Sequence, residues 1–218
     1  GLETAQKNAK DGISLVQTAE GALTEVHDML NRMVELATQS ANGTYDNDVD
    51  RTNLQSELDQ LRTEINRISD SANFNGIKLF NGSLATKGVT LQIGATSDNF
   101  NKINFKLAEM DAKGLGIQSI SITSATAAGS AISAIKAAIN KVSTVRGELG
   151  AIQNRLEHTI NNLSVMTENI QDAESTIRDT DVADEMMAYT KNNILVQSAQ
   201  AMLAQANQVP QGVLQLLQ

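Results

Sequence analysis

Between residues 131 and 177, apolar side chains recur with the spacing of a heptad repeat. One series returns every seven residues, and a second follows each member by three residues, so together they form a continuous a/d seam. The first series is Ile135, Val142, Leu149, Leu156, Leu163, Ile170 and Ile177, and the second is Ala138, Val145, Ile152, Thr159, Met166 and Ala173. A helix of this length is about 70 Å long. Because it cannot bury such a stripe alone, the sequence predicts partner helices that run alongside it.

Two N-terminal segments are the predicted partners of the seam. Residues 1–42 repeat apolar or small side chains at heptad spacing, and residues 48–71 place apolar side chains at alternating intervals of four and three. Together with a long helix at residues 130–178, they predict a mainly α fold, an elongated antiparallel helical bundle resembling a coiled coil. We expect the two N-terminal helices to cover the seam as far as Ile177.

Patterns of period two replace the helical pattern in residues 74–108. Val89–Ile93 and Ile103–Leu107 alternate apolar and polar side chains, which predicts a β-hairpin. Upstream, Asn75-Gly76 and Asn81-Gly82 are turn dipeptides. All four phenylalanines fall in this region, and we interpret them as a small separate hydrophobic cluster.

Two further segments complete the chain. Residues 109–129 form a connection rich in small and polar residues, in which Ile120 and Ile122 predict one more short strand. After the heptad pattern ends near Asp179, residues 180–218 predict a C-terminal helix with an apolar stripe and an apolar tail. The predicted bundle offers this helix no partner, so we expect residues 181–218 to be disordered in a monomer and to bind something outside it.

Composition and motifs exclude several functions. The net charge of −8 argues against nucleic-acid binding, and the chain has no apolar run long enough for membrane insertion. Without cysteine there is no thiolate chemistry. His27 and His158 are isolated, and the acidic turn at Asp46, Asp48 and Asp50 lacks the glycine and glutamate of a calcium loop. We therefore expect no cofactor, no metal and no enzymatic activity.

Several stretches resemble bacterial flagellin. They are Ala151-Ile-Gln-Asn-Arg-Leu156 with Thr159-Ile-Asn-Asn-Leu163, Ala201-Met-Leu-Ala-Gln-Ala-Asn-Gln-Val-Pro-Gln211, Asp11-Gly-Ile-Ser14, Thr18-Ala-Glu-Gly-Ala-Leu23 and Asn73-Phe-Asn-Gly76. The resemblance implies a rod domain at residues 1–179 and a filament-core helix and tail at residues 180–218. It also implies that about fifty residues which normally precede the rod domain are missing, and that a short connection replaces the outer domains of larger flagellins.

The resemblance further implies a function and a set of partners. The protein is expected to be a structural subunit of the flagellar filament, exported unfolded from the cytoplasm by the flagellar type III system and polymerised outside the cell through its terminal helices. The implied partners are other flagellin subunits, an export chaperone that grips the C-terminal helix, the filament cap and hook-associated proteins. The expected chaperone or filament-core contacts are Ile194, Leu195, Val196, Ala199, Met202, Leu203, Val209, Leu214 and Leu217.

Residues 30–40 are similar to the flagellin segment that Toll-like receptor 5 recognises. The matching positions imply a recognition site at Arg32, Glu35 and Leu36, with Glu57 on the following helix. A cation and an apolar side chain four residues apart share one helix face, which makes a plausible hot spot. The alternative interpretation is subunit packing in the filament, and one surface can serve both purposes. Val34 stands where the familiar motif has a second basic residue.

Three other functions compete with this interpretation. A hook–filament junction protein shares the helical bundle, but the Gln-Ala-Asn-Gln-Val-Pro ending disfavours it. An enzymatic flagellin would need a catalytic insert, which the short connection does not provide. A secretion chaperone or adaptor bundle would not need a β-hairpin between its helices.

Overall fold

The computed structural model describes residues 1–179 and 181–216, with the side chains of residues 211 and 213–216 left out. The chain divides into two compact units, residues 1–167 and residues 168–218. About 75% of the chain is helical, and the strands form two small antiparallel pairs. The predicted mainly α fold class is confirmed.

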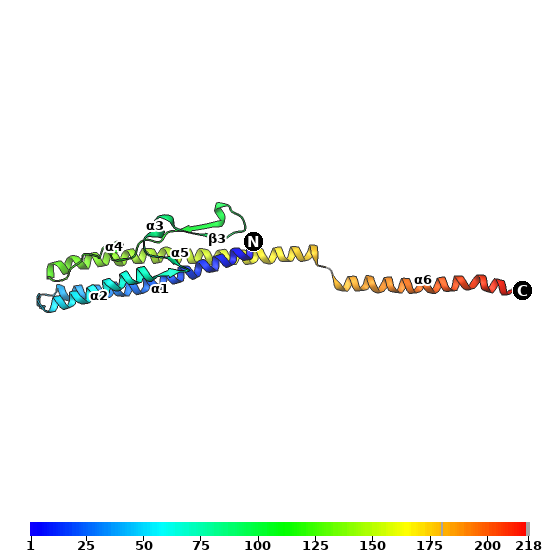
Figure 1. Cartoon of the computed structure of the whole chain (residues 1–218), viewed down its shortest axis with the longest axis horizontal. Helices are drawn as coiled ribbons and strands as arrows, with labels where there is room; N and C mark the ends of the chain where they lie inside the picture. The colour runs from blue at the N-terminus through cyan, green and yellow to red at the C-terminus, as the bar shows by residue number, and fades with distance from the viewer. Residues whose placement is uncertain (180, 217–218) are drawn as a thin grey trace. The chain divides into compact units, whose positions relative to one another are not determined.

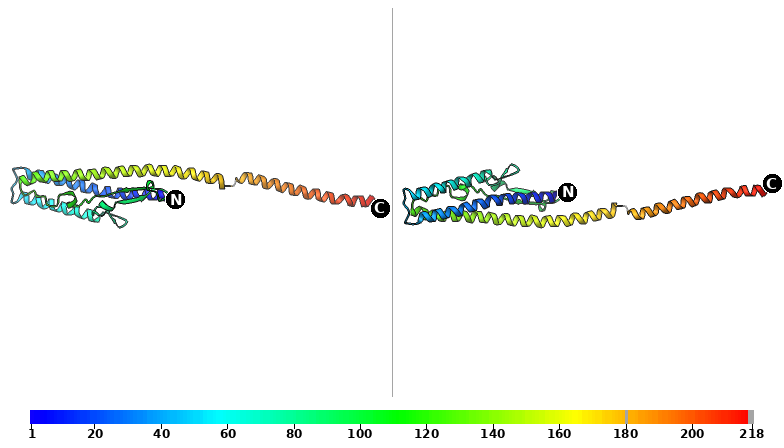
Figure 2. Two further views of the ribbon diagram at one scale, coloured as in Figure 1. Left: turned by 90° about the horizontal axis from the view of Figure 1, so that it is seen from above. Right: turned by 90° about the horizontal axis from the view of Figure 1, so that it is seen from below.

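Three long helices form the framework of the first unit (Figure 1). They are α1 (Leu2–Ala41), α2 (Asp50–Ser71) and α5 (Ala125–Arg178), of which α5 continues into the second unit. Seen from above and from below in Figure 2, α1 lies between α5 and α2 along the part of α1 that the shorter α2 accompanies. α5 begins five residues earlier than predicted because Ser124 caps it: its hydroxyl accepts a hydrogen bond from the Ala127 amide, and its carbonyl accepts one from Ala128.

α1 supplies the central stripe of the core. Its buried positions follow the predicted heptad series, and they are Ala5, Ala9, Gly12, Leu15, Val16, Ala19, Leu23, Val26, Leu30, Met33, Leu36, Ala37 and Ser40. α2 returns antiparallel to α1, since Arg51 binds Ser40 and Glu57, further along α2, pairs with the earlier Arg32. α5 is also antiparallel to α1, since Arg146 faces Glu20 at 3.7 Å and the later Leu156 faces the earlier Gly12. A stripe this wide serves two neighbours rather than one.

The seam of α5 is covered over only part of its length. Leu149, Leu156 and Leu163 are 1%, 0% and 5% exposed, whereas Ile170 and Ile177 in the same series are 53% and 83% exposed. The prediction that the N-terminal helices cover the seam up to Ile177 is therefore wrong.

The extent of α1 explains where the covering of the seam ends. A Cβ added at Gly12 would lie 3.3 Å from Leu156 Cδ1, so these two residues lie opposite each other. α1 begins ten residues before Gly12. Because antiparallel helices rise equally per residue, α1 covers α5 for only about ten residues beyond Leu156.

The region after α2 contains the predicted turns. β1 (Asn73–Phe74) pairs with β2 (Ile77–Lys78) around Asn75-Gly76, whose φ angles of 49° and 80° fit a type I′ turn. A short helix, α3 (Ser83–Lys87), follows Asn81-Gly82.

The predicted β-hairpin is confirmed. β3 (Val89–Gln92) pairs antiparallel with β4 (Lys102–Phe105), and the 3-10 helix η1 (Asn99–Asn101) lies in the connecting loop. β3 packs directly on α1, where a Cβ at Gly12 would come within 2.4 Å of Leu91 Cδ1 and where the Asn8 side chain donates a hydrogen bond to the Gln92 carbonyl at 3.0 Å. A larger residue at this position would require the Leu91 side chain to move, so glycine allows the hairpin to pack closely on α1.

The phenylalanines do not form a separate cluster. Phe80 and Phe105 belong to the same continuous core as the buried residues of α1 and α5, and Phe74 packs against it, whereas Phe100 is 79% exposed. That interpretation was wrong because the hairpin packs onto the helices instead of standing apart from them.

The connection before α5 contains one helical turn, α4 (Ala112–Leu115), and no strand at Ile120–Ile122. The predicted third strand is therefore wrong. Ile122 is buried, and side chains satisfy its backbone: its amide donates to Gln55 Oε1 at 2.7 Å, and its carbonyl accepts from the Ser40 hydroxyl. Side-chain hydrogen bonds replace a strand partner here.

The second unit contains α6 (Val182–Leu216). It is helical, although we expected disorder, because alanine, leucine, methionine and glutamine are strong helix formers. Pro210 lies inside the helix, where it removes one backbone hydrogen bond. Every described side chain of α6 is exposed.

Candidate functional site

The first candidate surface lies where α1 and α2 run side by side. Arg32 of α1 donates from Nε to Glu57 Oε1 on α2 at 2.9 Å and from Nη1 to Glu35 Oε2 at 2.9 Å. These two hydrogen bonds, that with Glu35 first, raise the pKa of Arg32 above its ordinary value. The structure therefore brings together three of the four predicted recognition residues in an exposed, charged cluster.

Leu36, the fourth predicted residue, is not part of that exposed cluster. Its side chain is completely buried in the core, even though it follows Arg32 by one helical turn. The idea of an exposed apolar side chain beside the cation is therefore not supported by the geometry. Leu36 belongs to the core, and the exposed surface consists of the charged groups of Arg32, Glu35 and Glu57.

Arg51 is a structural residue near this surface that the sequence did not reveal. Its side chain is buried, and its guanidinium donates to the carbonyls of Ser40, Asn42 and Tyr45 at 2.8, 2.7 and 2.5 Å, and to Asn47 Oδ1 at 2.6 Å. It thereby ties the last turn of α1 to the α1–α2 connection. No sequence pattern distinguishes such an arginine from a solvated one, because its acceptors are backbone atoms.

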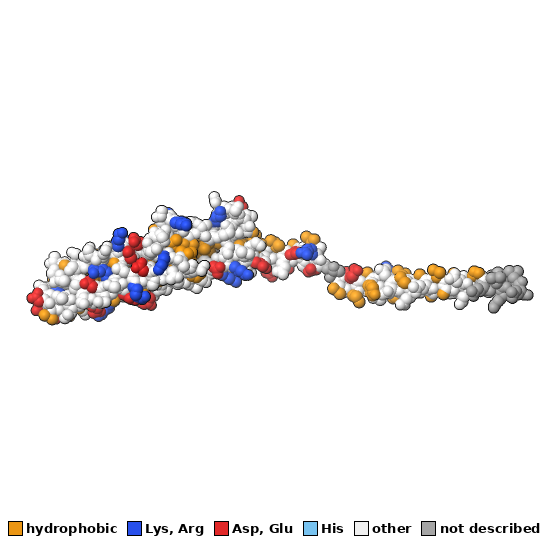
Figure 3. Space-filling view, in the orientation of Figure 1, with side chains coloured by type: hydrophobic (Ala, Val, Ile, Leu, Met, Phe, Trp, Pro, Cys, Tyr) orange, Lys and Arg blue, Asp and Glu red, His pale blue; other side chains and the backbone are white. Residues whose placement is uncertain are grey.

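The second candidate surface is α6. At 100° per residue, its exposed large apolar side chains fall on two opposite faces of the helix. One face carries Val182, Met186, Tyr189, Val196 and Leu203, and the other carries Met187, Ile194, Leu195, Met202 and Val209. Orange side chains extend along α6 in Figure 3. The sequence suggested a single stripe with adjacent residues, whereas the helix presents two faces.

The remaining predicted contact residues of this helix are partly outside what the structure describes. Ala199 is exposed and lies between the two apolar faces. Leu214 lies within the helical backbone of α6, but its side chain is outside the described part of the chain. Leu217 lies outside the described residues altogether.

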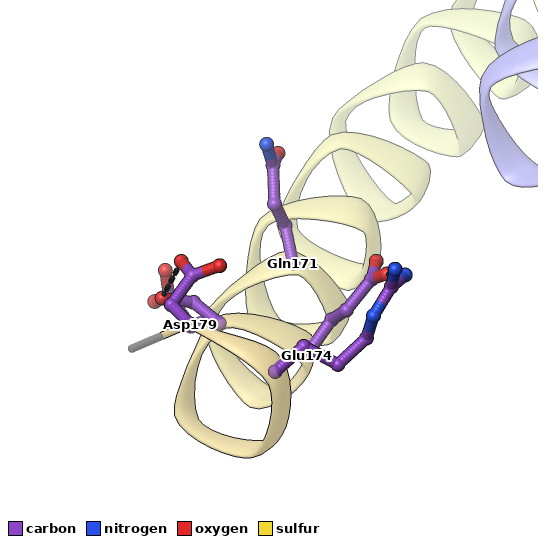
Figure 4. A pocket seen from close by; sticks show the side chains of 6 residues that line it. Gln171, Glu174 and Asp179 are labelled. Atoms are coloured by element: carbon purple, nitrogen blue, oxygen red, sulfur yellow. Dashed lines mark hydrogen bonds and ion pairs between the residues drawn. The ribbon is translucent and has the colours of Figure 1, made fainter. Parts of the chain in front are cut away.

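A shallow hollow at the end of α5 does not form a substrate site. Gln171, Asp172, Glu174, Ser175, Arg178 and Asp179 line it. All of them belong to the last turns of one helix or follow it directly, and they are exposed (Figure 4). Arg178 pairs with Glu174 at 2.5 Å, and Ser175 donates to Asp179 at 2.7 Å. One exposed helix end cannot enclose a ligand.

The described part of the chain offers no metal-ion site and no membrane-spanning helix. Among the described residues, no group of three or more His, Asp or Glu side chains is arranged to hold a metal ion. The acidic turn instead bonds to itself: the Asp46 amide donates to Asp50, and the Asp48 amide donates to Asp46. No helix in the described ranges combines the length and apolar character that crossing a bilayer requires.

A helical bundle with a hairpin on one side, joined to a helix that exposes apolar side chains on two faces, defines a class of structural proteins that bind other protein chains. The sequence matches the descriptions "Bacterial flagellin N-terminal helical region" over residues 1–85 and "Bacterial flagellin C-terminal helical region" over residues 132–217. The chain belongs to the bacterial flagellin family. It is thus a structural subunit of the flagellar filament that polymerises with other flagellin subunits.

Individual related proteins support the assignment of the chain to this family. The chain is 51% identical over 217 residues to a flagellin of Halalkalibacterium halodurans, a match that covers 100% of this chain and 79% of the relative. Among solved structures, Bacillus cereus flagellin superimposes with a TM-score of 0.62 and 32% identity over 77% of this chain and 94% of that one.

The hook-associated alternative shares only the fold. A structure assigned to a flagellar hook-associated protein from Vibrio parahaemolyticus has a TM-score of 0.65 but 16% identity, over 80% of this chain and 90% of that chain. The bundle alone therefore does not separate the two kinds of protein. The higher sequence identity to flagellins does.

Proposed function

We propose that this flagellin is exported unfolded, assembles outside the cell through α6, and has no enzymatic activity. The observation that carries the proposal is the pair of opposite apolar faces on α6. Residues 192–218 contain no Asp, Glu, Lys or Arg. A helix with one apolar face needs one partner, whereas a helix with two needs partners on both sides. Such a helix suits the interior of a polymer, where charges would be costly to bury.

The two parts of the chain have different roles in this proposal. Residues 1–179 act as the rod domain, and residues 180–218 act as the filament-core helix and tail. The exposed end of the α5 seam, at Ile170 and Ile177, adds apolar area that continues toward α6 in the sequence. We infer that this end is also covered by neighbouring chains in the filament.

Assembly of the full-length protein tests this proposal. Leu195→Asp places a carboxylate on an apolar face of α6, so we expect the critical concentration for filament formation to rise by about tenfold or more. Thr190→Asp is the matched control, because it adds the same charge between the two faces but beside Lys191 and outside the uncharged residues 192–218. Sedimentation and negative-stain microscopy measure the polymer, and circular dichroism checks the helix. Normal filaments from Leu195→Asp would refute the assignment of α6.

Before export, the same surface requires protection. An exposed apolar helix promotes non-specific association, and a chaperone that binds the helix would prevent it. We propose that an export chaperone contacts the residues of α6 from Ile194 to Leu203, and that the filament cap and hook-associated proteins contact the assembled subunits. Leu195→Asp should therefore weaken chaperone binding as well as assembly.

We further propose that Arg32, Glu35 and Glu57 form the contact for Toll-like receptor 5. The cluster is exposed and held by two hydrogen bonds, so it presents a fixed pattern of charge without further ordering. Subunit packing can use the same surface in the filament.

Arg32→Ala or Glu57→Ala should weaken receptor activation by roughly tenfold, as expected for a hot-spot residue. Helicity should be unchanged because the pair is exposed and contributes little to stability. Arg67→Ala is the matched control, since Arg67 pairs with Glu64 in a similar exposed ion pair on α2. Receptor-dependent signalling by monomeric protein measures the effect. Equal signalling by all three variants would exclude this site.

A further inference from the structure

The seven methionines differ in exposure. Met33 and Met110 are buried and Met29 is half-buried, Met166 of α5 is 43% exposed, and Met186, Met187 and Met202 of α6 are the most exposed at 56%, 63% and 74%. The chain has no cysteine, so methionine holds all of its sulfur. An oxidant that reaches the unassembled subunit therefore meets the thioethers of α6 before those of the core.

We propose that Met186, Met187 and Met202 form an oxidation site through which a hydroperoxide blocks assembly of the free subunit. This inference rests on the proposed role of α6 in assembly. The thioether sulfur attacks one oxygen of hydrogen peroxide, an S–O bond forms and the O–O bond breaks. Sulfur is oxidised by two electrons to the sulfoxide, the transferred oxygen loses its proton, and the other oxygen leaves as hydroxide that takes up this proton to become water.

The positions of the three methionines make the modification effective. Met186 lies on one apolar face of α6, and Met187 and Met202 lie on the opposite one, so both faces become polar when all three are oxidised. Met187 lines a largely apolar hollow on the surface of α6 with Ile194 and Leu195, and Met186, 100° away around the helix, lies at the edge of the same hollow. A sulfoxide is a strong hydrogen-bond acceptor, and apolar packing against a neighbouring chain would leave it unpaired.

Filament formation should in turn protect the three methionines of α6 from oxidation. Once the faces of α6 are packed in a polymer, peroxide no longer reaches these sulfur atoms. The modification therefore acts on subunits before they are incorporated and spares the finished filament. Methionine sulfoxide reductases reverse the reaction, so the block is reversible.

The experiment compares the full-length protein with a Met186→Leu/Met187→Leu/Met202→Leu variant, each treated with hydrogen peroxide as monomer and as filament. Leucine keeps the apolar volume and the helix propensity. Peptide mass spectrometry measures oxidation at each methionine, and sedimentation measures assembly. We expect the three methionines of α6 to be oxidised in the monomer before Met33 and Met110, and the critical concentration to rise by roughly tenfold or more. The treated leucine variant should assemble normally, and reductase treatment should restore the oxidised protein.

Three results would contradict this inference alone, and a fourth would also contradict the proposed function of α6. If monomers oxidised at all three positions assemble normally, the inference is wrong. It is also wrong if the treated leucine variant loses assembly, because the damage then lies at another residue, or if filaments are oxidised at these positions as fast as monomers. Untreated full-length protein that forms no filaments would overturn the proposed function of α6, and this inference with it.

Discussion

Replacing Arg51 with alanine should lower the free energy of unfolding by about 3 kcal/mol, because the change removes a charged donor from acceptors that are wholly or partly buried. The carbonyls of Ser40, Asn42 and Tyr45 all bind this one guanidinium. The Ser40 carbonyl lies in the last turn of α1, where it has no helical partner, and the carbonyls of Asn42 and Tyr45 lie in the connection that follows. The Asn42 carbonyl also accepts from the Tyr45 amide at 3.4 Å. Removing Arg51 takes one hydrogen bond from all three carbonyls at once and weakens the connection between α1 and α2.

Two variants isolate this effect. Arg51→Lys keeps the charge but loses the planar fork, so it should recover only part of the lost stability. Arg62→Ala is the control, because Arg62 forms an ordinary ion pair with Asp59 on the surface of α2 and should change stability by less than about 1 kcal/mol. Urea unfolding followed by circular dichroism measures all three. If Arg51→Ala proves no more destabilising than Arg62→Ala, the buried network contributes nothing beyond a surface pair.

The regular parts of this fold were predictable because they depend on local periodicity. The heptad series of α1 and α5 identified the core, and the alternation in Val89–Ile93 and Ile103–Leu107 identified the hairpin. Both signals are repeated over many residues, so one atypical position such as Thr159 does not hide them. The Asn75-Gly76 turn was predictable for a different reason, since only a few residues accept positive φ at both central positions.

The features that sequence did not reveal depend on single contacts between distant residues. Ile122 satisfies its backbone through Gln55 and Ser40, which lie 67 and 82 residues away, and no periodicity records such a pairing. Arg51 binds backbone carbonyls, which every residue possesses. In the proposed recognition cluster, the motif identified Arg32 and Glu57 correctly as neighbours, but it did not show that Leu36 faces the core.

The presence of two opposite apolar faces on α6 was not evident from the sequence pattern. Apolar residues on two sides of a helix weaken any single stripe, and the sequence then suggests one broad face. The arrangement becomes clear only when each exposed side chain is assigned an angle around the helix. The two arrangements also imply different partners. A single broad apolar face fits one groove, whereas two opposite apolar faces fit a position between neighbouring chains.

The seam of α5 yields the second large effect, because one apolar series passes from buried side chains to exposed ones along the helix. Leu149→Ala should destabilise the protein by about 2–5 kcal/mol, since it removes a large side chain from the closed part of the core. Ile170→Ala, three heptads later in the same series, should change the free energy of unfolding by no more than about 0.5 kcal/mol. Urea unfolding of the monomer measures both.

In filament assembly, Ile170→Ala should have the larger effect of the two substitutions, whereas Leu149→Ala has the larger effect on monomer stability. If neighbouring chains cover the open end of the seam, Ile170→Ala removes apolar area that is buried only in the polymer, and it should raise the critical concentration while the monomer stays as stable as before. Leu149→Ala should weaken the monomer and affect the contact between subunits much less, because its side chain is already enclosed by its own chain. Equal effects of both substitutions on monomer stability would show that the seam is covered throughout within one subunit. An unchanged critical concentration for Ile170→Ala would show that the open end takes no part in the filament. We therefore propose that the single heptad pattern serves two purposes along its length, folding up to Leu163 and association beyond it.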